Sequence, residues 1–216
     1  MKLPADNFHF NFFDRGKNTV DINIRLETSF DWYEVESLTR KAFWNFFDKE
    51  KQTICDEHLL VYRLRQTSAF VPELNFIAEI AQTGQIIGHI IYSKSRVISA
   101  GGIDNEVLTF GPISVLPEYQ KQGIGGALLR HSLDIAKEMG YCAVLIFGHV
   151  EYYPRFGFKP AAEFDIITSE GKSFDSFMVL PLYEGALDGI SGRFYLDPVY
   201  ENLTQEDALE FDKKFI

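Results

Sequence analysis

A glycine-rich turn near the middle of the chain constrains the fold more than any other feature. The apolar run Leu108–Val115 is followed by Pro117 and then by Gln120–Gly126, which reads QKQGIGG, and an amphipathic pattern begins directly after it. This order predicts a strand, a tight turn and the start of a helix. Backbone N–H groups at a helix N-terminus lack partners and attract anions, most often phosphates. We therefore expect the turn to bind a pyrophosphate.

The composition excludes several classes of protein. The chain has 216 residues, enough for one domain with an appendage, and 46% of them are hydrophobic, so disorder is not expected. No apolar run approaches the ~20 residues of a membrane span, and a net charge of −10 repels nucleic acid while favouring small cationic substrates. The N-terminal stretch lacks the continuous apolar core of a signal peptide, so we expect a cytoplasmic protein without nucleic-acid or membrane partners.

Periodicity predicts a mixed order of strands and helices. Residues 1–19 show no clear period and are interpreted as an arm. The strand over 143–147 should run parallel to the one before the turn, because a helix connects the two. The predicted strands are 22–26, 76–81, 85–93, 94–99, 107–115, 143–147, 164–168 and 176–182. The predicted helices are 31–47, 56–68, 123–139 and 204–214, with a brief helical turn over 150–155, and a glycine-broken segment ends at 193–195.

The turn does not match two better-known phosphate-binding motifs. No Lys-Ser/Thr follows its glycines, as a Walker loop requires, and Leu128 stands where a dinucleotide fingerprint needs its last glycine. Gln120, Gly123 and Gly125 instead resemble motif A of the GNAT superfamily of acetyl-CoA-dependent N-acetyltransferases, Gln/Arg-x-x-Gly-x-Gly/Ala. The segment Tyr152–Phe158, YYPRFGF, is similar to the family's motif B and stands at the expected separation. Together with the later GALDGISGRFY it resembles a bacterial subgroup of predicted acetyltransferases.

The resemblance covers roughly residues 22–182 and implies a fold. We expect an α/β protein of the α+β type, with a mixed central sheet of about six to seven strands and helices on both faces. The expected division is an N-terminal arm over 1–19, a GNAT domain over 20–182 and a C-terminal extension over 183–216 that packs on the same domain.

The resemblance also implies acetyl-CoA as the donor and a path for it along the motif. Its pyrophosphate would meet the successive N–H groups of the turn, with added positive charge from Lys121 and Arg130, and its pantetheine arm would pair with the backbone of the preceding strand. The expected cofactor-binding residues are Ile113, Ser114, Val115, Gln120, Lys121, Gln122, Gly123, Ile124, Gly125, Gly126 and Tyr153.

Direct acetyl transfer needs an acid for the departing thiolate and a base for the amine. Tyr153 stands five residues before Phe158, where the family's general-acid tyrosine lies, and its neighbour Tyr152 stays open as the alternative. For the base we consider His149, acting directly or through water, Glu106 near the start of the motif strand, and a water chain without a single responsible side chain. Each side chain also has a purely structural interpretation. Tyr153 would be an aromatic residue that lines the site, His149 a loop histidine, and Glu106 a solvated charge at the end of a strand.

The sequence therefore predicts an enzyme, an acetyl-CoA-dependent N-acetyltransferase that acts on a primary amine, preferably of a small molecule. No metal-ligand spacing or covalent-nucleophile motif is present, so direct transfer without a metal is expected. The alternative is a catalytically inactive acyl-CoA-binding or sensor module. The acceptor's identity is not readable, and a homodimer stays an open interpretation.

Overall fold

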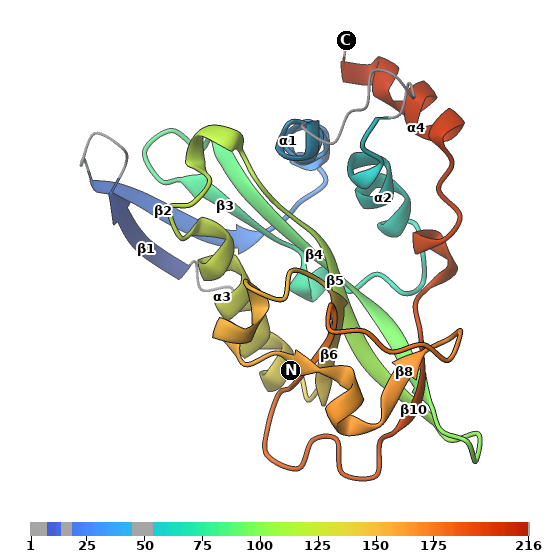
Figure 1. Cartoon of the computed structure of the whole chain (residues 1–216). Coiled ribbons are helices and arrows are strands. Elements are labelled where there is room, and N and C mark those ends of the chain that lie inside the picture. Colours follow the sequence, from blue (N-terminus) through green and yellow to red (C-terminus); the bar gives the residue numbers. More distant parts are fainter. Residues whose placement is uncertain (1–7, 14–18, 45–53, 216) are drawn as a thin grey trace. The chain divides into compact units, whose positions relative to one another are not determined.

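The computed structural model describes residues 8–13, 19–44 and 54–215 (Figure 1). They form two compact units, which are described here one at a time. Unit 1 consists of the described residues up to Ile91, Gly111–Ser132, and those from Val199 onward. Unit 2 consists of Tyr92–Phe110 and Leu133–Pro198. Strands β4 and β5 and helix α3 contribute residues to both units.

Unit 1 is built on strands in the order β1-β2-β3-β4-β5. Neighbours from β1 to β4 are antiparallel, and β3 and β4, which match strands predicted over 76–81 and 85–93, form a hairpin around Thr83 and Gly84. The strand predicted separately over 94–99 is the last part of β4, because no glycine or proline interrupts the chain there. The bounds are β1 Phe8–Phe13, β2 Thr19–Leu26, β3 Phe76–Ile80, β4 Ile86–Ile98 and β5 Asp104–Val115.

Strand β1 is a feature that the sequence did not reveal. The segment interpreted as an arm contains Phe8–Phe13, which pairs antiparallel with β2, with Phe8 opposite Ile24. The ring of Phe8 stacks on His131 of α3, with 5.2 Å between ring centroids. The alternation of phenylalanine with polar residues has the period of a strand, but it spans too few residues to be recognised without its partner.

Helices cover both faces of the sheet in unit 1. A Cβ atom built on Gly88 of β4 would lie 3.0 Å from the Leu128 side chain, so this face meets α3. The next residue, His89, points to the opposite face because side chains alternate along a strand. There the Nε2 atom of its ring lies 2.7 Å from Asn75 Oδ1. Asn75 donates a hydrogen bond to Glu27, and Glu27 forms an ion pair with Arg65 at the end of α2. The predicted arrangement of helices on both faces is confirmed.

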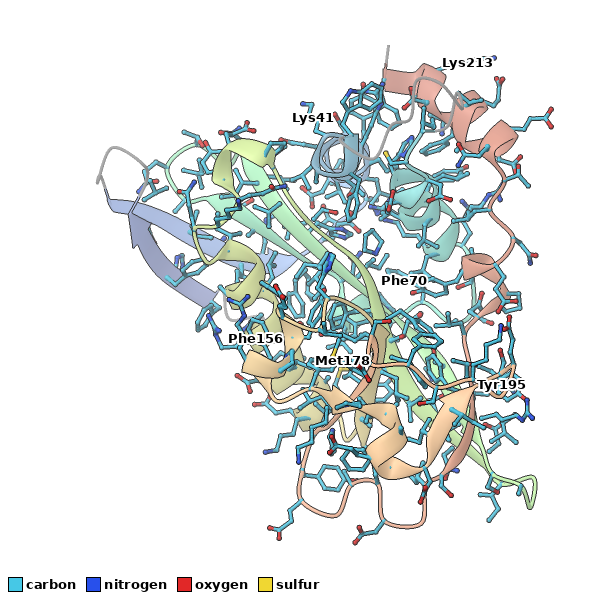
Figure 2. The ribbon with its side chains drawn as sticks, in the orientation of Figure 1. Lys41, Phe70, Phe156, Met178, Tyr195 and Lys213 are labelled. Carbon is cyan, nitrogen blue, oxygen red and sulfur yellow. The ribbon has the colours of Figure 1, made fainter. Side chains whose placement is uncertain are left out.

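Each of the four α-helices in the described part of the chain matches a predicted helix but is shorter than predicted. The predicted end of the first helix, at Phe47, falls in 45–53 and so lies outside the described residues. In Figure 1, α2 and α4 lie side by side, and Figure 2 labels Lys41 on α1 and Lys213 directly after α4. The bounds are α1 Trp32–Phe43, α2 Glu57–Leu64, α3 Ile124–Glu138 and α4 Gln205–Asp212.

Helix α4 begins at a side-chain cap and is held to α1 and α2 by an apolar cluster and an ion pair. The Thr204 hydroxyl accepts a hydrogen bond from the backbone N–H of Asp207, which starts the helix as a side-chain cap. Apolar side chains of α4, Phe211 among them, pack with Leu59 of α2. Asp212 accepts two hydrogen bonds from the guanidinium of Arg40 on α1. These contacts place the C-terminal segment in unit 1.

Next to this ion pair lies a buried histidine. The ring of His58 is fully buried, with its Nε2 atom 3.4 Å from Asp212 Oδ1 and its Nδ1 atom 3.8 Å from Cys55 Sγ. Burial lowers the pKa of His58 to about 4 and raises the pKa of the Cys55 thiol to about 12. Both groups are therefore neutral at pH 7.

Unit 2 contains the parallel pair predicted from the sequence. Strand β6 runs parallel to β5, with Val144 opposite Leu108, and the order continues as β6-β9-β7 with antiparallel pairs. Strand β10 joins β4 to β8, and its Phe194 packs in an apolar core with Phe177. Figure 2 labels Met178 on β9 and Tyr195 on β10. The bounds are β6 Ala143–Phe147, β7 Lys159–Pro160, β8 Ile166–Thr168, β9 Phe177–Pro181 and β10 Gly192–Tyr195.

The predicted fold class is confirmed, with a mixed sheet and helices. The described residues contribute ten strands, more than the six to seven expected, because β1 and the short strands β7 and β10 had not been predicted. Within the same residues, none of the helices combines the length and the apolarity needed to cross a bilayer. The division into an arm, a domain and an extension stays a prediction.

Candidate active site

The loop that joins β5 to α3 in unit 1 has the geometry of an anion-binding turn. A short 3₁₀ turn, Pro117–Tyr119, ends the strand, and the chain then passes through left-handed conformations at Lys121, with φ of 62°, and Gly123, with φ of 92°. The first hydrogen bond of the helix runs from Ala127 N–H to the Gly123 carbonyl, at 2.9 Å. Successive turns of this kind point neighbouring N–H groups to one side of the backbone.

The N–H groups of this loop have no acceptors. Across the described parts of the chain, none of the backbone N–H groups from Lys121 to Gly126 has a hydrogen-bond partner. The last three belong to the first turn of α3, where the helix dipole adds partial positive charge. Unpaired donors at a helix N-terminus are suited to an anion with several oxygen atoms, such as a pyrophosphate.

Two glutamine side chains brace the loop from within. Gln120 donates through Nε2 to the Val115 carbonyl at 3.0 Å, and Gln122 donates through Nε2 to the Glu118 carbonyl at 2.9 Å. The Ile124 side chain is buried in the core. The predicted cofactor residues from Gln120 to Gly126 thus lie in one loop, whose side chains support it while its backbone supplies the donors.

Strand β5 has a free edge next to this loop. Its parallel pairing with β6 is limited to Leu108 and Val144 among the described residues, although β5 continues to Val115. The N–H of Leu116 donates to the Ile87 carbonyl of β4, at 3.0 Å. Because successive backbone groups alternate between the two edges, Ile113 and Val115 present theirs to the edge away from β4.

Ser114, the third predicted residue of this strand, has a different role. It is buried and its hydroxyl donates to Thr39 Oγ1 of α1, at 3.1 Å. Its side chain therefore fixes β5 against α1. The open backbone groups of this edge are those of Ile113 and the N–H of Val115, because the Val115 carbonyl accepts from Gln120.

Tyr153 lies in an aromatic environment in unit 2. Its side chain is 9% exposed, and its ring centroid lies 5.8 Å from that of Phe110, 5.7 Å from Phe158 and 5.0 Å from Tyr152. Burial, with a smaller contribution from Tyr152, raises its pKa to about 12. Its hydroxyl has no hydrogen-bond partner in the parts of the chain that the structure describes. A protonated phenol with a free O–H is chemically able to act as an acid.

The predicted bases lie on exposed positions. His149 follows β6, its side chain is exposed, and its carbonyl accepts the N–H groups of Tyr152 and Tyr153. Glu106, near the start of β5, is exposed and lies 3.1 Å from Lys94 Nζ. The Lys94 contact occupies Glu106 in a surface ion pair of a type that is usually structural.

Two residues that the sequence did not single out lie against a predicted site residue or against the strand that carries some of them. A Cβ atom built on Gly148 would overlap the Cδ2 and Cε2 atoms of the Tyr153 ring, so the ring rests on this backbone in unit 2. In unit 1 the hydroxyl of Tyr200 lies 3.5 Å from the carbonyl oxygen of Gly111. A glycine directly after a buried strand is a weak sequence signal for Gly148. The sequence carries no signal for Tyr200.

Residues 32–158 match the model of the acetyltransferase (GNAT) family. The chain is 30% identical over 169 residues to the uncharacterized N-acetyltransferase YhbS of Escherichia coli, covering 78% of this chain and 92% of that one. It is 36% identical over 104 residues to the uncharacterized N-acetyltransferase YjhQ of Escherichia coli, covering 48% of this chain and 55% of that protein, or about half its length.

Solved structures agree with the sequence matches. A crystal structure of YhbS from Escherichia coli in complex with CoA aligns with a TM-score of 0.72 at 27% identity, covering 86% of this chain and 94% of that one. A GNAT family acetyltransferase from Brucella melitensis in complex with acetyl-CoA aligns with a TM-score of 0.62 at 29% identity, covering 83% and 97%.

Proposed function

Because the chain belongs to the acetyltransferase (GNAT) family, we propose that it transfers an acetyl group from acetyl-CoA to the primary amine of a small molecule. The observation that carries this proposal is the run of unpaired N–H groups from Lys121 to Gly126 beside the free edge of β5. Both features lie in unit 1 and suit one elongated ligand with an anionic end and an amide-bearing arm.

In this proposal the loop N–H groups bind the pyrophosphate of the donor, and the backbone of Ile113 and Val115 pairs with the amides of its pantetheine arm. Lys121, which is exposed in the same loop, adds positive charge. When bound, acetyl-CoA supplies the acetyl group as a thioester. YhbS, solved with CoA, and the Brucella melitensis enzyme, solved with acetyl-CoA, support the choice of donor.

The transfer forms a bond between the acceptor nitrogen and the acetyl carbonyl carbon and breaks the carbon–sulfur bond. The nitrogen loses one proton and the departing thiolate gains one. We assign the donated proton to Tyr153, because its raised pKa keeps the phenol protonated at neutral pH. For the proton that leaves the amine we assign His149, directly or through water, because its exposed imidazole lies just before Tyr153 in the same turn.

A coupled assay tests the function. CoA should raise the melting temperature of the protein, and a panel of amines should make acetyl-CoA release free thiol. A shift in melting temperature without amine-dependent thiol release would favour an inactive binding module. The absence of any shift would contradict the proposed donor site.

Replacing the proposed acid provides a sharper test. Tyr153→Phe should lower kcat about 100-fold with little change in CoA affinity, because only the O–H is lost. Tyr152→Phe tests the neighbouring hydroxyl, and Tyr183→Phe, at a position 47% exposed, serves as the matched control. If Tyr153→Phe retains the wild-type rate while Tyr152→Phe loses it, the acid is Tyr152.

A further inference from the structure

Unit 2 carries two neighbouring exposed phenylalanine rings at the end of β6. Phe147, the last residue of β6, is 47% exposed, and Phe174, which precedes β9, is 43% exposed. Their ring centroids lie 5.8 Å apart. Single exposed apolar side chains are ordinary on a protein surface, whereas neighbouring ones form an apolar patch that a ligand can cover. We call Phe147 and Phe174 the phenylalanine pair.

Buried neighbours hold the phenylalanine pair in place. Phe147 lies opposite Phe177 of β9 in the antiparallel register, and the two rings stack with 4.9 Å between their centroids. The Phe174 carbonyl accepts the N–H of Phe177, at 2.9 Å. Phe177 is fully buried and packs against Phe194 of β10, with 5.3 Å between centroids. The exposed rings therefore rest on a fixed core, and a ligand need not order them when it binds.

The phenylalanine pair stands beside the segment that carries the proposed acid and base. Gly148 follows Phe147 directly, and its N–H donates to the Ser176 carbonyl, at 2.9 Å. This hydrogen bond joins the end of β6 to the segment that holds Phe174. His149 comes next in the chain. All of these residues belong to unit 2, so the exposed rings and the proposed catalytic side chains lie on adjoining segments of one unit.

Tyr153 and Phe147 lie on opposite faces at this end of the sheet. A Cβ atom built on Gly148 would meet the Tyr153 ring and, at 3.3 Å, the Ile146 side chain. Side chains alternate along a strand, so Phe147 points the other way. In the proposed function Tyr153 gives its proton to the sulfur, which places the donor's thioester on the Tyr153 side. The body of the acceptor needs a different surface, and the phenylalanine pair offers one at the same strand end.

The size and the charge of this surface favour a small aromatic amine over a second protein. Two phenylalanine side chains that are each nearly half exposed present roughly 200 Å², enough for one ring. A stable interface between proteins needs about 800 Å² from each partner. Asp175, which is exposed and directly follows Phe174, adds a carboxylate, and the net charge of the chain is −10. Both attract an ammonium group, which becomes the nucleophile when it loses a proton.

We propose that Phe147 and Phe174 bind an aromatic ring of the acceptor, so that the substrate is a primary amine that carries such a ring. This inference rests on the proposed function. Contacts between aromatic rings add to the free energy gained by burying apolar area. An amine without a ring leaves this surface to water and loses both contributions. Phe174 lies outside the residues that match the family model.

Two substrates test the assignment on the wild-type protein. The amine 2-phenylethylamine should have a KM about tenfold lower than that of ethylamine, which lacks the ring. Calorimetry should show the same order of affinity for the complex with CoA. Equal KM values and equal affinities would overturn the assignment. A wild type that releases no thiol with any amine of the panel would overturn the proposed function instead.

Two variants then locate the preference. Phe147→Leu keeps an apolar side chain on the core and Phe174→Ala removes the other ring, and each should reduce the difference between the two amines to about threefold or less. CoA should bind both variants with unchanged affinity. Ile103→Ala, at a position 64% exposed in the turn between β4 and β5 of the same unit, is the control and should keep the full preference.

The outcomes that contradict the assignment are distinct. A full preference for the aromatic amine in both variants would show that its ring binds elsewhere. A wild-type dimer that Phe174→Ala separates into monomers in sedimentation, with both amines bound equally by the wild type, would assign the phenylalanine pair to a second copy of the chain.

Discussion

Gly148 leaves room for the aromatic ring of the proposed acid. A side chain at this position would overlap ring atoms of Tyr153, and the same Cβ would lie 3.3 Å from Ile146 Cδ1. Since the ring is also enclosed by Phe110 and Phe158, it has little freedom to move aside. In the proposed function, Gly148 is therefore a positioning residue that acts through Tyr153.

We predict that Gly148→Ala lowers kcat about tenfold, because the methyl group displaces the Tyr153 ring while the backbone can still adopt its conformation. Steady-state kinetics measures the loss, and the CoA-induced shift in melting temperature should persist. Gly101→Ala is the control, because its added Cβ would meet only Ser99 Oγ, at 3.8 Å. A double variant with Tyr153→Phe should be no slower than Tyr153→Phe alone, and an additive loss would show that Gly148 does not act through the tyrosine.

Tyr153 and Gly148 differ in how far the sequence could identify them. Tyr153 stands inside the YYPRFGF segment, so its candidacy follows from the resemblance of that segment to motif B of the GNAT family. Gly148 precedes that segment and becomes visible only when the ring is seen against the backbone. A close approach between a ring and a glycine leaves no pattern in the sequence, because its partner is chosen by the fold.

At the scale of elements, the start of α3 carries the proposed donor site. We predict that Gly125→Glu abolishes the CoA-induced shift in melting temperature, because a carboxylate fills the space meant for the pyrophosphate. The fold should persist, because an acidic residue in the first turn of a helix is favourable with the helix dipole. Gln82→Glu, in the exposed turn between β3 and β4, adds the same charge elsewhere and should keep the full shift. A retained shift in Gly125→Glu would contradict the donor site.

The docking of α4 provides a second test among the elements. Asp212 is 8% exposed and bonds Arg40 of α1, whereas Asp207 on the same helix is 43% exposed and pairs with Arg63. Asp212→Asn should lower the free energy of unfolding by about 3 kcal/mol, because it leaves a partly buried guanidinium without its counter-charge. Asp207→Asn should change little, because exposed ion pairs contribute little. Urea denaturation measures the free energy of unfolding of both variants. Equal losses would show that the difference in burial between the two ion pairs does not determine their contribution to stability.

The elements themselves were largely predictable. The strand, glycine turn and helix from Asp104 to Glu138 follow from an apolar run, two glycines and a 3.6-residue period, all of which are local. Strand β1 and the contact of Tyr200 with Gly111 were not predictable, because each depends on a partner far away in the chain. The candidate bases were not predictable for the same reason, since no local sequence pattern shows whether Glu106 forms an ion pair or contacts a substrate.

At the scale of the whole molecule, buried histidines make stability depend on pH. Burial lowers the pKa of His58 to about 4, whereas an imidazole in the unfolded chain titrates near 6.5. As the pH falls from about 6.5 toward 4, the unfolded state takes up a proton that the folded state excludes, and the folded state loses stability. One such group contributes at most about 1.4 kcal/mol per pH unit.

We predict that His58→Gln flattens the fall of unfolding free energy between about pH 6.5 and pH 4, measured by urea denaturation at several pH values. His149→Gln, at an exposed histidine, is the control and should keep the wild-type slope. His89 is fully buried and its pKa is also lowered, so a residual slope should remain in His58→Gln. A wild-type slope in His58→Gln would contradict the assignment of the proton to this ring.

The composition of the proposed donor site also bears on how the specificity of such a protein can evolve. In unit 1 the proposed donor residues are nearly contiguous in sequence, from Ile113 to Gly126, and the N–H groups of their loop belong to the backbone. Mutations elsewhere in the chain can therefore accumulate without touching the residues proposed to hold the donor. A library that spares 113–126 is accordingly the economical starting point for redirecting the enzyme to new acceptors.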